Sequence, residues 1–188
     1  AKIKKAVQEH LSEGELKTPD RGGSNSTAEV GDDVFGEDPT VNALQDKAAS
    51  LFGMEKVLFC PSATMTNQIA IKAHTQPQDE VICDRKAHIY NYEGGGIAYN
   101  SLASVRLLEG ERGCFTADML QENINPDDIY CPSSALVSLE NTMNKGGGSV
   151  YDFREIEKIR QVCIQHNLKM HLDGARLFNA LIEKNETP

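Results

Sequence analysis

The chain has 188 residues, of which 39% are apolar, and a formal net charge of -9. This length and apolar content suit one domain with a real core. The negative charge argues against a nucleic-acid-binding or anionic-membrane surface, because both need basic patches. No apolar run approaches the ~20 residues that span a bilayer.

The N-terminal residues and the cysteines indicate a cytoplasmic protein. Residues 1–17 mix Lys and Glu without an apolar stretch, which is typical of neither a secretory signal nor a transit peptide. The five cysteines are widely spaced and include no C-x-x-C pair, which indicates reduced thiols. The lack of an initial Met indicates a processed product or a fragment.

The start of the chain predicts two helices separated by a linker. Residues 2–16 carry apolar side chains at helical spacing and residues 18–26 collect turn formers, so residues 1–27 are interpreted as a helix and linker. A second helix is predicted from about Asp38 to Phe52.

Strands alternate with helices after that point. Strands are predicted over residues 56–60, 80–84, 104–108, 134–140 and 168–173, and helices over residues 68–74 and 150–166 and from Thr116. This alternation implies an α/β fold with a doubly wound, mostly parallel sheet. Because the chain stops soon after a helix begins near Ala175, residues 28–188 are expected to form an incomplete domain without its closing strands.

One carboxylate and one guanidinium lie at the end of the last predicted strand. Asp173 falls where that strand ends, and Arg176 follows in the turn. Ligands of open α/β sheets bind at the carboxyl ends of strands, where an ionised Asp suits a metal ion or a protonated ring nitrogen. The simpler alternative is that Asp173 only caps the following helix.

Two other turns could bind a ligand. The first backbone N–H groups of a helix are unpaired, so the turn at Ser62 and Thr64 could hold a phosphate, unless a hydroxyl there only caps the helix. His88 could stack on a planar ligand or act as a general acid or base, although a loop His is more often solvated.

Several other motifs are rejected on spacing. Glycines 94–96 do not form a dinucleotide fingerprint, and Lys145 before glycines 146–148 lacks the spacing of a phosphate-binding Walker loop. The five histidines show no metal-ligand spacing, so no metal site is predicted.

A phosphate anchor, a ring stacker and a buried carboxylate on successive strand ends match the needs of pyridoxal 5'-phosphate (PLP). A carboxylate opposite the pyridine nitrogen keeps that nitrogen protonated, which lets the ring accept the electrons of a carbanion. The chain resembles the threonine aldolases of the fold-type I PLP-dependent enzymes, a broader group that includes the aromatic amino acid β-eliminating lyases. The matching segments are residues 30–41, 61–67, 72–77, 87–93, 138–142 and 171–179.

The resemblance implies roles for residues in three of these segments. Ala63 and Thr64 would offer backbone N–H groups to the PLP phosphate, with the hydroxyls of Ser62 and Thr64 nearby. His88 would stack on the ring, and Asp173 would pair with the ring nitrogen.

The resemblance also implies a reaction and an assembly. Together with His88 and Asp173, Arg176 would serve catalysis, binding the carboxylate of a small amino-acid substrate. The family cleaves β-hydroxy-α-amino acids, such as threonine to glycine and acetaldehyde, and works as homodimers or tetramers. The alternatives left open are β-elimination on the same scaffold and an inactive or partner-binding fragment.

One expected residue is missing. The lysine that holds PLP covalently lies in a Ser-Lys-Gly segment after Asp173 in this family, and the chain contains no Ser-Lys pair. We therefore expect a truncated chain whose independent activity is uncertain. Lys145, Lys169 and Lys184 lack that context and are predicted to be surface amines.

Overall fold

The computed structural model describes residue 36 and residues 38–188. The chain divides into two compact units, residues 1–60 with Pro188 and residues 61–187. The predicted helix and linker over residues 1–27 lie outside the described residues.

The described part of the first unit contains helix α3, Pro39–Phe52. It begins where the sequence predicts, because Oδ1 of Asp38 accepts hydrogen bonds from the N–H groups of Thr40 (2.7 Å) and Val41 (3.1 Å). It ends at Gly53, which adopts a left-handed conformation with a φ of 62°.

The strand predicted over residues 56–60 is wrong. Within the described residues 38–60 this run forms no strand, and the N–H group of Phe59 donates instead to Oε1 of Gln45 (2.7 Å). Leu58 and Phe59 are 50% and 46% exposed. Apolar composition favours burial, but a strand also needs a neighbouring strand to pair with, and this run has none among the described residues.

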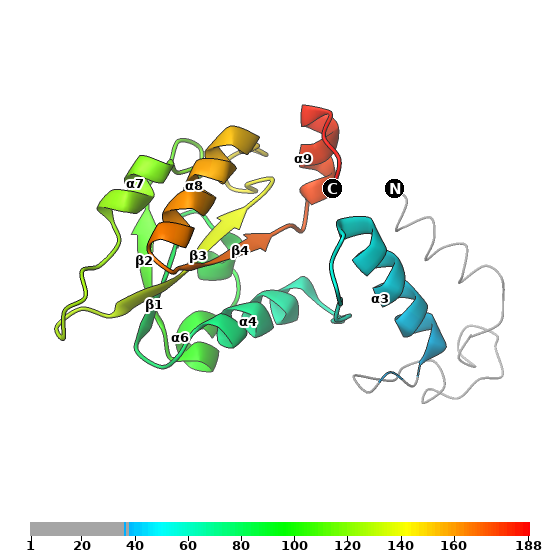
Figure 1. The fold of residues 1–188 in the computed structure, drawn as a ribbon, viewed down its shortest axis with the longest axis horizontal. Coiled ribbons are helices and arrows are strands. Elements are labelled where there is room, and N and C mark those ends of the chain that lie inside the picture. Colours follow the sequence, from blue (N-terminus) through cyan, green and yellow to red (C-terminus); the bar gives the residue numbers. More distant parts are fainter. Residues whose placement is uncertain (1–35, 37) are drawn as a thin grey trace. The chain divides into compact units, whose positions relative to one another are not determined.

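The second unit is built on a parallel sheet, as the sequence predicts, and this sheet has four of the five predicted strands (Figure 1). The strand order is β2-β1-β3-β4. The strands are β1 Asp79–Asp84, β2 Ser104–Leu108, β3 Ser133–Glu140 and β4 Lys169–Asp173.

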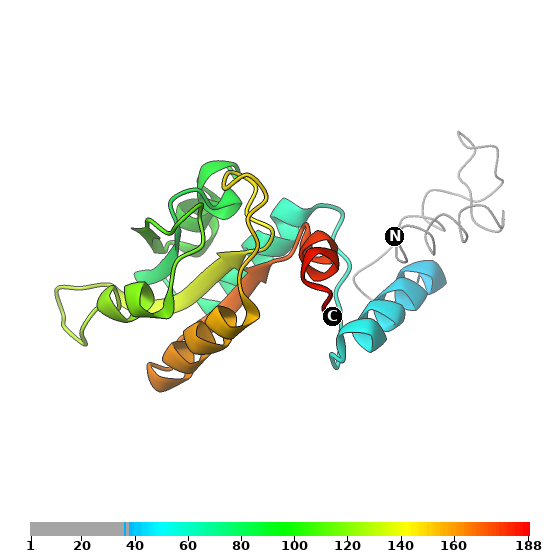
Figure 2. The same ribbon diagram turned by 90° about the horizontal axis from the view of Figure 1, so that it is seen from above.

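Helices cover both faces of this sheet (Figure 2). On one face lie α4 Ala63–His74, α5 His88–Asn91 and α6 Gly96–Ser101, and on the other lie α7 Ala117–Glu122 and α8 Phe153–Gln165. Side chains of strand β1 point alternately to the two faces. Val81 and Cys83 pack against α4, α5 and α6, and Ile82 packs against α7 and α8. Helix α9, Leu177–Lys184, follows β4.

Several boundaries differ from prediction. Helix α4 begins five residues earlier than residue 68, and the short helices α5 and α6 were not predicted. The predicted start at Thr116 is confirmed, since its hydroxyl accepts from the N–H group of Met119 (3.2 Å). Helices shorter than two turns carry little periodicity. Unlike α7, the helices α5 and α6 also have no side-chain cap that would mark their start.

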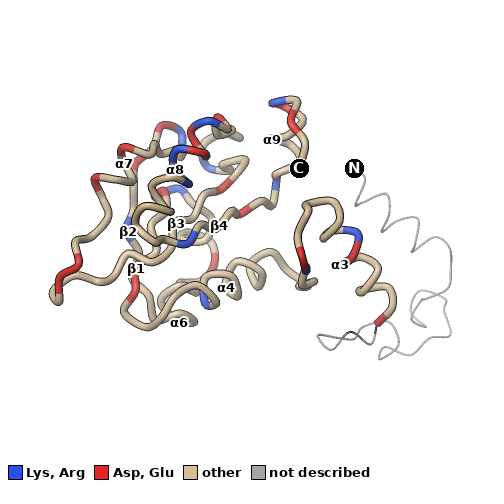
Figure 3. Tube along the Cα trace, viewed as in Figure 1, with Lys and Arg blue, Asp and Glu red and all other residues tan. Residues whose placement is uncertain are grey.

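The parallel arrangement places the carboxyl ends of the strands at one edge of the sheet. Glu140 and Asp173 are register partners at the ends of β3 and β4, and both are buried. Figure 3 shows an acidic position (red) at the end of β4 and a basic position (blue) in the turn before α9.

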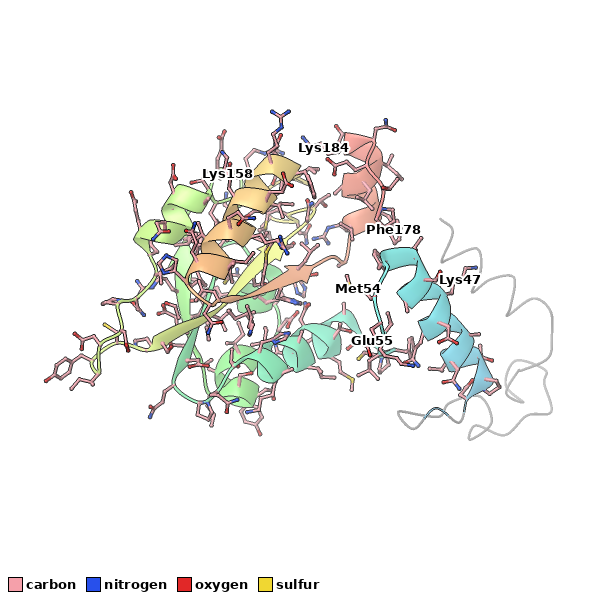
Figure 4. All side chains as sticks on the ribbon, in the orientation of Figure 1. Lys47, Met54, Glu55, Lys158, Phe178 and Lys184 are labelled. Carbon is pink, nitrogen blue, oxygen red and sulfur yellow. The ribbon has the colours of Figure 1, made fainter. Side chains whose placement is uncertain are left out.

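Other predictions concern the surface and the thiols. No helix among the described residues is long and apolar enough to cross a membrane. All five cysteines are free thiols. Lys145, Lys169 and Lys184 are exposed, as predicted, and Figure 4 shows Lys184 at the far end of α9.

Candidate functional site

Asp173 ends β4 as a buried carboxylate that is 5% exposed. Its Oδ1 accepts a hydrogen bond from the N–H group of Ala175 (3.2 Å), and its Oδ2 accepts one from Nδ2 of Asn67 (3.1 Å). The cap residue of α9 is Arg176, not Asp173. The simpler interpretation of Asp173 as the cap of that helix is therefore wrong.

Asn67, in the second turn of α4, links Asp173 to a second buried carboxylate. Its Nδ2 donates to Oε1 of Glu93 (2.8 Å) as well as to Asp173. Its Oδ1 lies 3.1 Å from Nε2 of His171. Because the amide nitrogen faces two carboxylates, the amide oxygen faces His171 and must accept a hydrogen bond from a protonated Nε2.

The side chain of Glu93 is fully buried and is surrounded by donors. Its Oε1 also accepts from Nδ1 of His88 (3.1 Å), and its Oε2 accepts from Nε2 of Gln68 (2.6 Å). We call Asn67, Gln68, His88, Glu93 and Asp173 the Glu93 network. It joins α4, the loop after α5 and the end of β4.

A glycine makes room for this network. A Cβ atom added at Gly96 would lie 2.5 Å from the side-chain Cδ and Oε1 of Gln68. The third glycine of the run 94–96 is therefore needed for close packing of α6 on α4.

His88 is the first residue of α5 and has a side chain that is 34% exposed. Its backbone N–H donates to Oε2 of Glu140 (2.8 Å), and its ring centroid lies 5.5 Å from that of Tyr92. Nζ of Lys145 sits 5.0 Å from the centroid of the Tyr92 ring. His88 is thus held at its backbone and at its ring, which differs from the alternative of a freely solvated loop residue.

Arg176 lies in the turn between β4 and α9 and is also held in place. Its Nη2 donates to Oε1 of Glu140 (2.7 Å) and to the carbonyl of Thr142 (3.0 Å). Its Nε lies 3.3 Å from both Oγ1 and the carbonyl oxygen of Thr142. Thr142 also borders a groove of about 560 Å³ that runs along α9.

The turn at Ser62 begins α4. The hydroxyl of Ser62 accepts from the N–H group of Met65 (3.2 Å), so Ser62 caps the helix. Ala63 and Thr64 are the first helical residues and are exposed, and the N–H groups of a first helical turn have no partner within the helix. Asn67, three residues after Thr64, connects this helix end to Asp173.

Burial shifts two pKa values near the strand ends. Burial lowers the pKa of His171 below 6.5, and the nearby carboxylates of Asp173 and Glu93 oppose this effect. Burial, reinforced by the charges of Asp84 and Glu140, raises the pKa of the Cys83 thiol to about 12. The thiol of Cys83 is therefore protonated at neutral pH and is not a nucleophile.

A metal ion is one possible occupant of this cluster. Among the described residues, His88, Glu93 and Asp173 offer ligand atoms that lie within 4.8 Å of one another. The Nδ2 group of Asn67 donates to both carboxylates, however, so hydrogen atoms already point at the oxygens that a cation would need. The geometry is that of a hydrogen-bonded network.

The sequence analysis did not identify six residues that shape this site. Five of them are polar residues in or at the end of an apolar strand or in the first turns of a helix, and the sixth, Glu93, lies in the loop after α5. The five are Asn67, Gln68, Glu140, Thr142 and His171.

Comparisons with known proteins identify relatives of this chain. The chain is 40% identical to the low specificity L-threonine aldolase of Escherichia coli K12 over 156 residues, which cover 82% of this chain and 46% of that protein. It matches the solved structure of Leishmania major threonine aldolase with a TM-score of 0.59 and 29% identity, covering 64% of this chain and 34% of that one.

A more distant solved structure shows the fold alone. The serine palmitoyltransferase of Sphingomonas wittichii matches with a TM-score of 0.61 at 17% identity, covering 90% of this chain and 37% of that one. The sheet and its helices are therefore the fold-type I architecture of PLP-dependent enzymes.

The chain spans less than half the length of the curated relatives that it matches. The sequence model of the beta-eliminating lyase family, whose members depend on PLP, matches residues 22–188. The chain belongs to the beta-eliminating lyase family.

Proposed function

We propose that the full protein is a PLP-dependent lyase of the threonine aldolase type, which cleaves threonine and related β-hydroxy-α-amino acids to glycine and an aldehyde. The identity to the Escherichia coli low specificity L-threonine aldolase supports this proposal. The single observation that carries it is the buried Asp173 carboxylate, joined through Asn67 to the His88–Glu93 pair at the carboxyl ends of parallel strands.

The donor set fits PLP. A buried carboxylate suits a protonated pyridine nitrogen, a partly exposed imidazole suits the ring face, and the exposed N–H groups at the start of α4 suit a phosphate. In this assignment Asp173 holds the ring nitrogen, His88 contacts the ring, and Ala63 and Thr64 bind the phosphate. Bound PLP supplies an electron sink for the carbanion formed at Cα.

Ser62 acts indirectly in this proposal. Its hydroxyl is engaged with the N–H group of Met65, so it shapes the first turn of α4 and thereby the phosphate-binding N–H groups. If Ser62 also contacted the phosphate while accepting from Met65, its hydroxyl would donate a hydrogen bond to a phosphate oxygen.

Arg176 binds the substrate carboxylate in the same proposal. Nη2 is engaged with Glu140 and Thr142, and Nε with Thr142, so the guanidinium is fixed before substrate arrives. The guanidinium carries five N–H donors, so Nη1 remains to meet a carboxylate. A fixed guanidinium loses less conformational entropy on binding than a mobile one.

We also propose that residues 28–188 form part of the PLP-binding domain, and that the full protein is a cytoplasmic homo-oligomer acting on small amino acids. The family match over residues 22–188 supports the domain assignment.

The products identify the reaction. Purified full protein with PLP should release acetaldehyde and glycine from threonine. Release of ammonia and pyruvate from tyrosine or tryptophan, without aldehyde from threonine, would favour β-elimination instead and would contradict the proposal.

A further inference from the structure

We propose that Glu93 is a positioning residue that determines which ring nitrogen of His88 carries the proton and fixes the orientation of that ring. Nothing in the proposed reaction requires a carboxylate at this position, and the sequence analysis gave Glu93 no role. The inference rests on the proposed function only in assigning His88 to the PLP ring.

The protonation state of the ring follows from the acceptor. A carboxylate only accepts hydrogen bonds, so the contact between Oε1 of Glu93 and Nδ1 of His88 requires a hydrogen on Nδ1. A neutral imidazole carries one N–H. The neutral ring of His88 is therefore the Nδ1–H tautomer, and its Nε2 keeps a free lone pair.

The carboxylate of Glu93 cannot rotate to release this contact. Oε1 accepts from Asn67 and His88, and Oε2 accepts from Gln68. Rotation would break hydrogen bonds on both oxygens of a fully buried group, which is costly.

The donors around Glu93 are themselves fixed. Nδ2 of Asn67 also donates to Asp173, and its Oδ1 faces His171. Gln68 is confined by Gly96, where even a Cβ atom would overlap its amide. The orientation of Glu93 is thus set by α4, α6 and the end of β4 together.

Two carboxylates hold His88 at different points. Oε2 of Glu140 accepts from the backbone N–H, and Oε1 of Glu93 accepts from the ring. The first contact fixes where α5 begins, and the second fixes the rotation of the imidazole. A ring held in this way presents one face in a defined orientation, as a stacking partner requires.

The tautomer can be read directly in the protein without PLP. Long-range 1H–15N correlation on 15N-histidine-labelled protein, about two pH units above the ordinary imidazole pKa of ~6.5, should show His88 protonated on Nδ1. A His88 ring protonated on Nε2 in the unaltered protein would overturn the inference without any variant.

Two variants separate positioning from mere stability. Glu93→Gln keeps an acceptor oxygen and should retain the Nδ1–H tautomer, while Glu93→Met removes the acceptor and should move the proton toward Nε2. Glu93→Met should also weaken PLP binding about tenfold, because the imidazole of His88 loses the hydrogen bond to a charged acceptor that orients it. Glu157→Gln on the exposed face of α8 is the control and should change neither property.

The outcomes distinguish this inference from the proposed function. An unchanged tautomer in folded Glu93→Met would contradict the positioning role, whether or not PLP binds. If the tautomer responds as expected but the unaltered full protein does not bind PLP, the proposed function fails and the control of His88 by Glu93 stands.

Discussion

Oε1 of Glu140 accepts a 2.7 Å hydrogen bond from Nη2 of Arg176, while Oε2 of the same carboxylate accepts one from the backbone of His88. Glu140 is 3% exposed and ends β3, the strand next to β4. One buried carboxylate therefore positions the residue proposed to bind the substrate and the residue proposed to stack on PLP.

Replacing Glu140 with Gln should lower the free energy of unfolding by about 1–3 kcal/mol, because the new amide nitrogen faces at least one N–H donor. Urea unfolding measures this change. Glu109→Gln is the matched control: its 2.6 Å ion pair with Arg85 is exposed, so the change should stay within about 0.5 kcal/mol. Equal losses in the two variants would contradict the special position of Glu140.

Arg176→Lys should raise KM for the amino-acid substrate roughly tenfold or more and change kcat less, because a lysine ammonium cannot keep the bonds to Glu140 and Thr142 while contacting a carboxylate. Steady-state kinetics on the full protein measures both constants. Arg85→Lys, at an exposed site, is the control. A fall in kcat at constant KM would place Arg176 outside substrate binding.

Gly96→Ala should destabilise the protein by about 1–3 kcal/mol, because its Cβ atom would overlap the amide of Gln68 and displace a donor from Glu93. Thermal or urea unfolding tests this expectation. Gly174→Ala is the matched control, since its Cβ would meet its nearest atom, Cβ of Leu177, at 3.4 Å. A stable Gly96→Ala variant would show that the Glu93 network tolerates movement of Gln68.

The stability of the protein should depend on the protonation of His171. Burial lowers the pKa of His171 in the folded state, so the unfolded chain binds more protons between that value and 6.5. The neutral His171 therefore makes its full contribution to the free energy of unfolding above pH ~6.5. This contribution is lost as the pH falls through the folded-state pKa of His171.

His171→Gln isolates this effect, because glutamine can still donate to Oδ1 of Asn67 but does not titrate. The loss of unfolding free energy between pH 7 and pH 5, followed by urea titration, should be smaller in the variant. The same pH dependence in both proteins would show that His171 is not a source of acid sensitivity.

The sequence predicted the repeating part of the fold well. Strands such as 134–140 and helices such as 150–166 carry a clear apolar pattern, and the structure confirms β3 and α8 within a few residues. The run 56–60 is also mostly apolar but has no neighbouring strand among the described residues, and pairing between distant segments leaves no local pattern.

The candidate site was predictable only in part. Asp173 and Arg176 stand out because charge follows an apolar strand directly. Asn67 gave no such signal, because a polar residue early in a helix is common, and its importance comes from Asp173, which is 106 positions away in the chain. Tertiary packing, which brings α4 against the end of β4, decides its role.

The most direct test of the central claim is the dissociation constant of PLP for the full protein and its Asp173→Asn variant, measured by the absorbance change of PLP. The account predicts that the variant binds PLP at least about tenfold more weakly, because an amide does not hold the ring nitrogen protonated. Asp118→Asn on the exposed surface of α7 should bind as the unaltered protein does. Equal affinity of folded Asp173→Asn and the unaltered protein would contradict the account.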